Sequence, residues 1–212
     1  MCLLSTLVLC PLSAQASSGL YSSNARIGST RVASPPTLCE ADFEIADAPV
    51  VIEELPEPKY VHSRSKSEIS ALENESSGHL RDAVGLTLVL AGTVQTRIRD
   101  TETRNGASCT VVESVRILPM KEVTVYVARE YPVGSCNFEV IRRHEDEHVA
   151  IARRLVTEYR PRLLEAVKGV RLQEIVSAVQ GVIDELQRAM RDANRLLDRR
   201  DTENSLRECA SW

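Results

Sequence analysis

The spacing of apolar residues changes once along the chain, near residue 137. Between residues 86 and 130, apolar and polar positions alternate and β-branched residues dominate, which is typical of strands in an antiparallel sheet. After residue 137, apolar residues recur every three or four positions, which predicts long amphipathic helices. Strands are expected at residues 86–90, 93–98, 110–117 and 122–127, with turns at 104–107 and 118–121.

Only short elements are expected before this sheet. Residues 50–52 and 59–62 predict short strands, because each is a brief apolar run bounded by polar or proline-containing sequence. Residues 67–75 predict a short helix with Ser67 as its cap. Residues 17–38 are rich in serine and contain a Pro-Pro pair, so we expect a flexible N-terminal stretch there.

The helical pattern after the sheet contains two residues that can interrupt a helix. Pro161 either kinks one long helix or starts a second. Lys168 and Gly169 form a typical helix end, a cation in the last turn followed by glycine, so we expect the chain to reverse at Gly169. The sequence therefore predicts an α+β fold in which a small antiparallel sheet packs on a long helical hairpin.

Composition and charge limit the domain organisation and the partners. The chain has 212 residues, of which 43% are hydrophobic and 26% are charged, enough for one well-packed core. We expect a single domain over residues 39–212. The net charge is −4, and lysine and arginine are interspersed with acidic residues, which argues against a nucleic-acid partner.

The first 16 residues carry no charge and hold an apolar run too short to span a bilayer. They end in Ala14-Gln15-Ala16, a small-x-small sequence typical of signal peptidase cleavage, although the usual basic start is absent. We therefore expect residues 1–16 to be a signal peptide, the mature chain to lack a transmembrane segment, and the protein to be secreted or periplasmic.

Export would leave four cysteines in the mature chain, an even number in an oxidising compartment. Two disulfides are the expected outcome, and three connectivities are open. Among these, we favour a pair that joins the predicted strands to the start of the first long helix, and a pair that joins the two ends of the mature chain. These favoured pairs are Cys109 with Cys136 and Cys39 with Cys209.

The first long helical segment contains the pattern H-E-x-x-H at residues 144–148. His144 and His148 lie one helical turn apart, so both imidazoles can reach one Zn²⁺ ion, and Glu145 occupies the position of the general base in zinc hydrolases. A solvated helix face with two unrelated histidines is the alternative. The chain has four histidines in all, and two fall at ligand spacing, which favours the metal site.

A third protein ligand is expected, and the other histidines are distant in the chain. If the helices reverse at Gly169, the residues opposite the histidines lie near 190–194. That count brings Asp198, our preferred ligand, within reach, and it leaves three further acids open: Asp192, Asp201 and Glu203. A reversal at Pro161 would instead point to Glu174.

The chain resembles a family of exported bacterial H-E-x-x-H proteins described as secreted zinc-dependent proteases. The resemblance extends from residues 59–72 through 109–119 and the H-E-x-x-H helix to residues 194–202. It implies a zincin-like domain with a zinc cofactor, histidine ligands at His144 and His148, and Glu145 as base. The family tends to show Asp followed by His-Gly near the C-terminus. Residues 197–204 contain no histidine, so the third ligand stays open.

Motif and resemblance together predict a zinc-dependent metallopeptidase whose substrate is a peptide or protein. Glu145 would activate the attacking water, and a peptide could add to the edge of the predicted sheet. A zinc-binding protein without turnover and a metal-free envelope interaction protein built on the helical hairpin are the alternatives.

Overall fold

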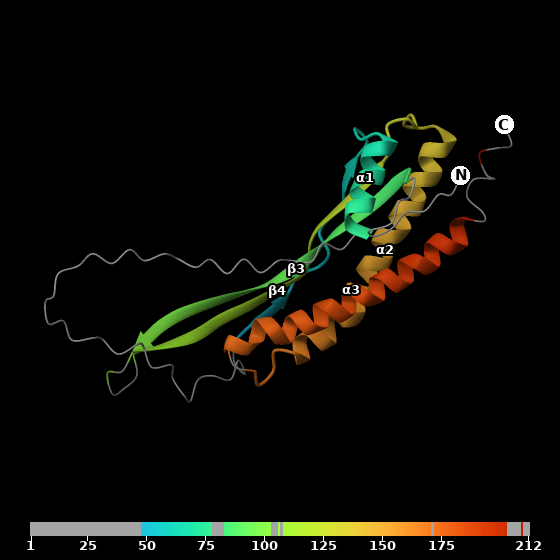
Figure 1. The fold of residues 1–212 in the computed structure, drawn as a ribbon. Coiled ribbons are helices and arrows are strands. Elements are labelled where there is room, and N and C mark those ends of the chain that lie inside the picture. Colours follow the sequence, from blue (N-terminus) through green and yellow to red (C-terminus); the bar gives the residue numbers. More distant parts are fainter. Residues whose placement is uncertain are drawn as a thin grey trace, which may run out of the picture.

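The computed structural model describes residues 48–77, 83–102, 106, 108–170, 172–202 and 209. The expected signal peptide, the expected flexible stretch at residues 17–38, and Cys39 lie outside these residues. The described chain is of mixed α and β type (Figure 1), as the fold class predicted. No helix within the described part of the chain is both long enough and apolar enough to cross a membrane.

The sheet is built around one long central strand, β4 (Ser108–Val127). β3 (Gly85–Glu102) pairs antiparallel with β4 along almost its whole length. On the other edge of β4, β1 (Val50–Ile52) and β2 (Lys59–Val61) both pair parallel with it. The expectation of a purely antiparallel sheet was therefore wrong. The chain returns through α1 and β3 before it enters β4, which gives β4 the direction of β1 and β2.

The strands predicted as two separate pairs merge into one long hairpin. The predicted turn at residues 118–121 is absent. The strand runs through Pro119, which lies opposite Gly92, between the pairs Ala91↔Met120 and Thr93↔Leu118. A Cβ atom on Gly92 would lie 1.7 Å from the carbonyl oxygen of Leu118, so only glycine allows this close approach. A register shift beside it, between Leu90 and Ala91, absorbs one extra residue of β4.

Helices cover both faces of the first half of this hairpin, and Val112 and Val115 of β4 still pack on helical residues beyond it. α1 (Lys66–Ser77) packs through Ile69 against Leu86 on one face of the sheet. α2 (Cys136–Glu165) packs on the other face, where Val149 and Val156 meet Val89. The other half of the hairpin extends past the helices (Figure 1), and its side chains from Gln95 to Asp100 are exposed.

The helical hairpin consists of α2 and α3 (Leu172–Thr202). α2 continues through Pro161 without a break, so the prediction that the chain reverses at Gly169 is confirmed. Gly169 has φ of 62°, the left-handed conformation that favours glycine after a helix. Apolar residues of both helices form a core with β1 and β4; its members include Ile117, Leu163, Ile175, Val179 and Ile183.

Serine side chains cap the first two helices. Ser135 Oγ accepts a hydrogen bond from the backbone N–H of Phe138, at the start of α2. For α1, the cap is Ser65 and not the predicted Ser67. Ser65 Oγ accepts from the N–H of Glu68, and the Glu68 carboxylate accepts from the N–H of Ser65. The Ser65 N–H and hydroxyl both donate to the Glu68 carboxylate, and these hydrogen bonds lower the pKa of Glu68.

The structure pairs Cys136 with Cys209 and so overturns the favoured connectivity. Cys109 lies near the start of β4, and 18 residues of strand separate it from Val127, a span of about 60 Å at the usual rise per residue. Cys136 lies beyond that far end, so Cys109 cannot reach it. The observed disulfide joins the N-terminus of α2 to the chain that follows α3.

Candidate metal centre

The candidate metal centre lies between α2 and α3, near the end of the hairpin that the disulfide closes. His144 and His148 project from successive turns of α2 toward α3. Because the two helices are antiparallel, Asn194 comes opposite His148, and Asp198 comes within reach of both histidines. The structure thus brings the preferred third residue, Asp198, together with the two histidines of the motif.

Three donor atoms converge in this group. His144 Nε2 lies 3.2 Å from His148 Nε2, and Asp198 Oδ1 lies 3.1 Å from His148 Nε2 and 3.5 Å from His144 Nε2. Ligands about 2.0–2.1 Å from a tetrahedral zinc ion are separated by about 3.3 Å. Octahedral ligands at similar bond lengths are separated by about 3.0 Å. The group could therefore hold a metal ion, and its spacing fits a tetrahedral ion well.

Burial and charge favour a cation at this position. The His148 side chain is fully buried, and those of Asp198 and His144 are 3% and 13% exposed. Burial disfavours the charged form of His148, but the hydrogen bond to Asp198 and the charges of Glu145 and Asp198 outweigh it, so the pKa of His148 is raised. Burial also opposes ionisation of Asp198, yet its two histidine partners lower its pKa.

Asn194 orients one of the two imidazoles. Its side-chain oxygen accepts a hydrogen bond of 2.8 Å from His148 Nδ1. A proton on Nδ1 leaves the lone pair on Nε2, the nitrogen that faces His144 and Asp198. Asn194 is 1% exposed. Sequence reasoning missed this residue, although a polar side chain at a helical spacing of four from buried Met190 could have indicated it.

Glu145 lies next to the group, on the side of α2 that faces the sheet. Its carboxylate is fully buried and accepts a hydrogen bond of 2.8 Å from Thr87 Oγ1 of β3. A Cβ atom on Gly85 would lie 2.5 Å from Glu145 Oε1, so the absent side chain leaves room for the carboxylate. The sequence did not predict the roles of Thr87 and Gly85, because no local pattern connects them with a helix more than 50 residues later.

The other candidate ligands do not join this group. Asp192 is exposed and lies 3.7 Å from Arg195, and Glu174 is exposed near the start of α3. The side chain of Asp201 and the whole of Glu203 lie outside the described residues. His62 contacts the Tyr131 carbonyl oxygen at 2.8 Å instead.

The other two acidic residues between the histidines, Asp146 and Glu147, contact different groups. Asp146 accepts from the Tyr60 hydroxyl at 2.7 Å, and Glu147 pairs with Arg200 of α3.

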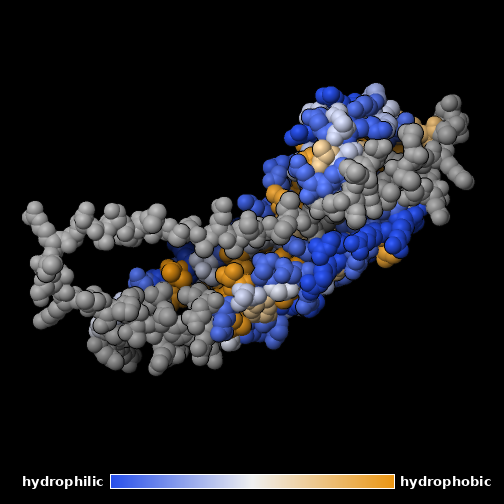
Figure 2. Space-filling view, viewed as in Figure 1, coloured by the Kyte–Doolittle hydropathy of each residue, from blue (hydrophilic) through white to orange (hydrophobic). Residues whose placement is uncertain are grey.

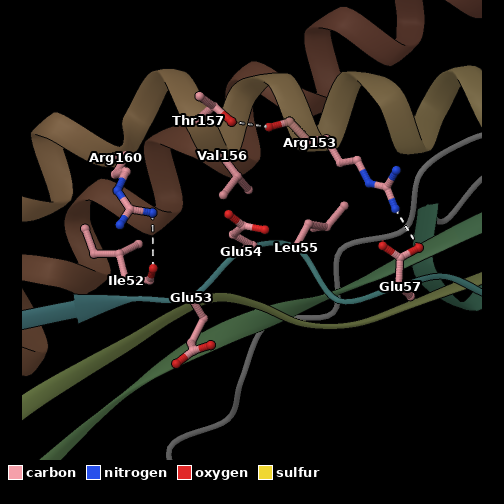
Figure 3. Close-up of a pocket in the computed structure, with 9 residues that line it drawn as sticks. All are labelled: Ile52, Glu53, Glu54, Leu55, Glu57, Arg153, Val156, Thr157 and Arg160. Atoms are coloured by element: carbon pink, nitrogen blue, oxygen red, sulfur yellow. Dashed lines mark hydrogen bonds and ion pairs between the residues drawn. The ribbon is translucent and has the colours of Figure 1, made fainter.

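A separate cleft of about 410 Å³ lies along the flank of α2 that is turned toward the β1–β2 linker (Figure 3). Arg153 pairs with Glu57 at 2.8 Å at one end, and Arg160 donates to the Ile52 carbonyl oxygen at 3.2 Å at the other. The Glu54 carboxylate points toward α2 between them. None of the three metal-centre residues lines this cleft, and its two arginines connect α2 with the chain between β1 and β2.

Comparisons with known proteins identify no relative. No family model, no curated protein and no solved structure matches the chain.

Proposed function

We propose that the protein binds one zinc ion through His144, His148 and Asp198 and hydrolyses peptide bonds. The observation that carries this proposal is the convergence of the three donor atoms beside the buried carboxylate of Glu145. Zinc bound there would lower the pKa of a coordinated water and polarise a substrate carbonyl. The donor set, two imidazoles and one carboxylate, leaves a position open, as catalytic zinc sites do. The same set also suits Fe²⁺, so metal identity is part of the test.

The residues of the chain have separate roles in this proposal. Asn194 keeps His148 Nε2 free of a proton, and Asp198 supplies the one negative charge among the ligands. Glu145 accepts a proton from the attacking water. Thr87 holds the Glu145 carboxylate against β3. Because His144 is the most exposed of the three metal-centre residues, substrate would approach from its side.

The disulfide supports a location outside the cytoplasm. Disulfides persist in oxidising compartments, and Cys136–Cys209 joins two segments 73 residues apart. We therefore retain secretion or a periplasmic location as part of the proposal.

The decisive experiment compares wild type with Glu145→Gln in two measurements, zinc content and hydrolysis of a broad peptide library. We expect the variant to keep about one zinc per chain and to lose hydrolysis by a factor of about a hundred or more, since it cannot accept the proton. Asp146→Asn is the matched control, because Asp146 is a neighbouring acid bound to Tyr60. Loss of zinc from Glu145→Gln, or equal hydrolysis by both proteins, would contradict the assigned role.

The complete burial of Glu145 and His148 favours a second candidate, a zinc site without turnover that fastens α3 to α2. This candidate predicts a lower melting temperature in chelator and no peptide hydrolysis by wild type. An unchanged melting temperature in chelator would contradict both zinc-binding candidates and favour the metal-free interaction protein.

A further inference from the structure

The outward face of the second half of α3 carries a row of four arginines, Arg188, Arg191, Arg195 and Arg199. At 100° per residue their spacing places all four within a sector of about 80° of the helix circumference, and the row is about 17 Å long. The buried residues of the same segment, such as Met190 and Leu197, lie on the opposite side. Figure 2 shows a strongly hydrophilic band along this part of α3.

The row differs from the surface of α2, where arginines are paired along the helix. There, Arg142 contacts Glu139 at 2.9 Å and Asp146 at 3.3 Å, and Arg154 contacts Glu158 at 3.6 Å. These are oppositely charged pairs at spacings of three and four, which stabilise a helix.

In α3, the same spacings bring arginine next to arginine. Such pairs destabilise a helix by a few tenths of a kcal/mol each. Only Arg195 has an acidic partner, exposed Asp192 at 3.7 Å; Arg188, Arg191 and Arg199 form no ion pair with another residue in the described part of the chain. A bound row of anions would relieve this repulsion.

We propose that this face of α3 docks on a membrane surface of anionic phospholipid, with the helix lying flat. Four guanidinium groups on one side of the helix can each contact a lipid phosphate, and arginine binds phosphate through two parallel hydrogen bonds. Leu196 flanks the row and is 66% exposed, so it can enter the acyl boundary beside the headgroups.

The test is sedimentation of the full chain with vesicles of phosphatidylglycerol and phosphatidylcholine, or of phosphatidylcholine alone. Wild type should bind the anionic vesicles, less so as salt rises, and should not bind the neutral ones. Replacing all four arginines by glutamine should lower the partition coefficient by about a hundredfold or more. Replacing them by lysine should retain most of the binding, because the charge is kept.

A matched control removes the same charge elsewhere. Four arginines that sit in ion pairs on other surfaces, Arg97, Arg99, Arg116 and Arg154, are replaced by glutamine. This control has the same net charge as the α3 glutamine variant. Its partition coefficient should stay within a few-fold of that of wild type. Equal binding by the two glutamine variants would overturn the proposal. So would binding to soluble polyphosphate without binding to anionic vesicles, which would assign the row to a polyanion.

Discussion

The two halves of the β3–β4 hairpin belong to the same pair of strands but have different surroundings. The half from Gly85 to Gly92 is covered on one face by α1 and on the other by α2, and its residues are buried almost without interruption. The half from Gln95 to Glu102 is largely uncovered: its β3 side chains up to Asp100 are exposed, Arg97 and Arg99 pair with Glu113, and Val115 of β4 still packs on the helices. A polar side chain in the covered half must find a partner inside the protein. Thr87 donates a hydrogen bond to Glu145, and this bond connects the sheet with the candidate metal centre.

The largest expected difference is in the free energy of unfolding lost when an isoleucine is shortened in the core or on the exposed end of the hairpin. Ile117 is fully buried between the sheet and the helical hairpin, whereas Ile98 is 53% exposed on the uncovered half. We expect Ile117→Ala to lower the free energy of unfolding by about 3 to 4 kcal/mol, and Ile98→Ala to lower it by less than about 1 kcal/mol. Denaturant unfolding monitored by circular dichroism measures both. Similar losses would show that a further surface covers the second half in solution.

The disulfide is expected to stabilise the covered end. It closes a loop with a sequence separation of 73 residues, and a disulfide typically stabilises a protein by about 2 to 4 kcal/mol. The double variant Cys136→Ser/Cys209→Ser should lose that stability, and reductant should then have little further effect on it. An unfolding midpoint equal to that of oxidised wild type would argue against the pairing.

A smaller effect should follow from the hydrogen bond between β3 and α2. Thr87→Val removes the hydroxyl that donates to Glu145, and a hydrogen bond to a charged group is worth about 2 kcal/mol. Thr87→Ser keeps the donor and should restore most of the stability. Thr96→Val, an exposed position on the uncovered half of the same strand, is the control and should change stability by less than about 0.5 kcal/mol. Equal losses at both positions would contradict the assigned contact.

The smallest effect concerns pH in the metal-free protein. The raised pKa of His148 stabilises the fold below the ordinary value of 6.5, and this contribution is lost as pH rises through the folded-state pKa. The lowered pKa of Asp198 stabilises above 3.8, and that contribution is lost as pH falls through its folded-state pKa.

In chelator, the melting temperature should therefore decline as pH rises through the folded-state pKa of His148. Added zinc should raise it most above that pKa, because the metal competes with the proton on His148. His148→Ala should abolish both trends, and a wild-type melting temperature that rises with pH in chelator would contradict this assignment.

Local patterns predicted most of the helical part of the site. The H-E-x-x-H spacing placed His144 and His148 on one face, and the glycine signal at Gly169 gave the reversal. The count from that reversal puts residue 190 opposite His148 and residue 194 opposite His144. In the structure Asn194 contacts His148 and Asp198 lies between both histidines, one helical turn further along α3.

Contacts between distant segments were not predictable in this way. In the sequence, Pro119 made one continuous strand look like two strands joined by a turn. The strand continues because Gly92 lies close to Pro119, and that approach depends on the cross-strand register. The length of the merged strand keeps Cys109 away from Cys136, and Cys136 pairs with Cys209 instead.

Metal content per chain is the direct measure of whether His144, His148 and Asp198 hold one zinc ion. The full chain is loaded with zinc, dialysed and analysed by elemental mass spectrometry, in wild type and in His148→Ala, Asp198→Ala and His62→Ala. We predict about one zinc in wild type and in His62→Ala, whose imidazole contacts Tyr131 instead, and none in the other two. No zinc in wild type after loading, or equal zinc in His148→Ala, would contradict the account.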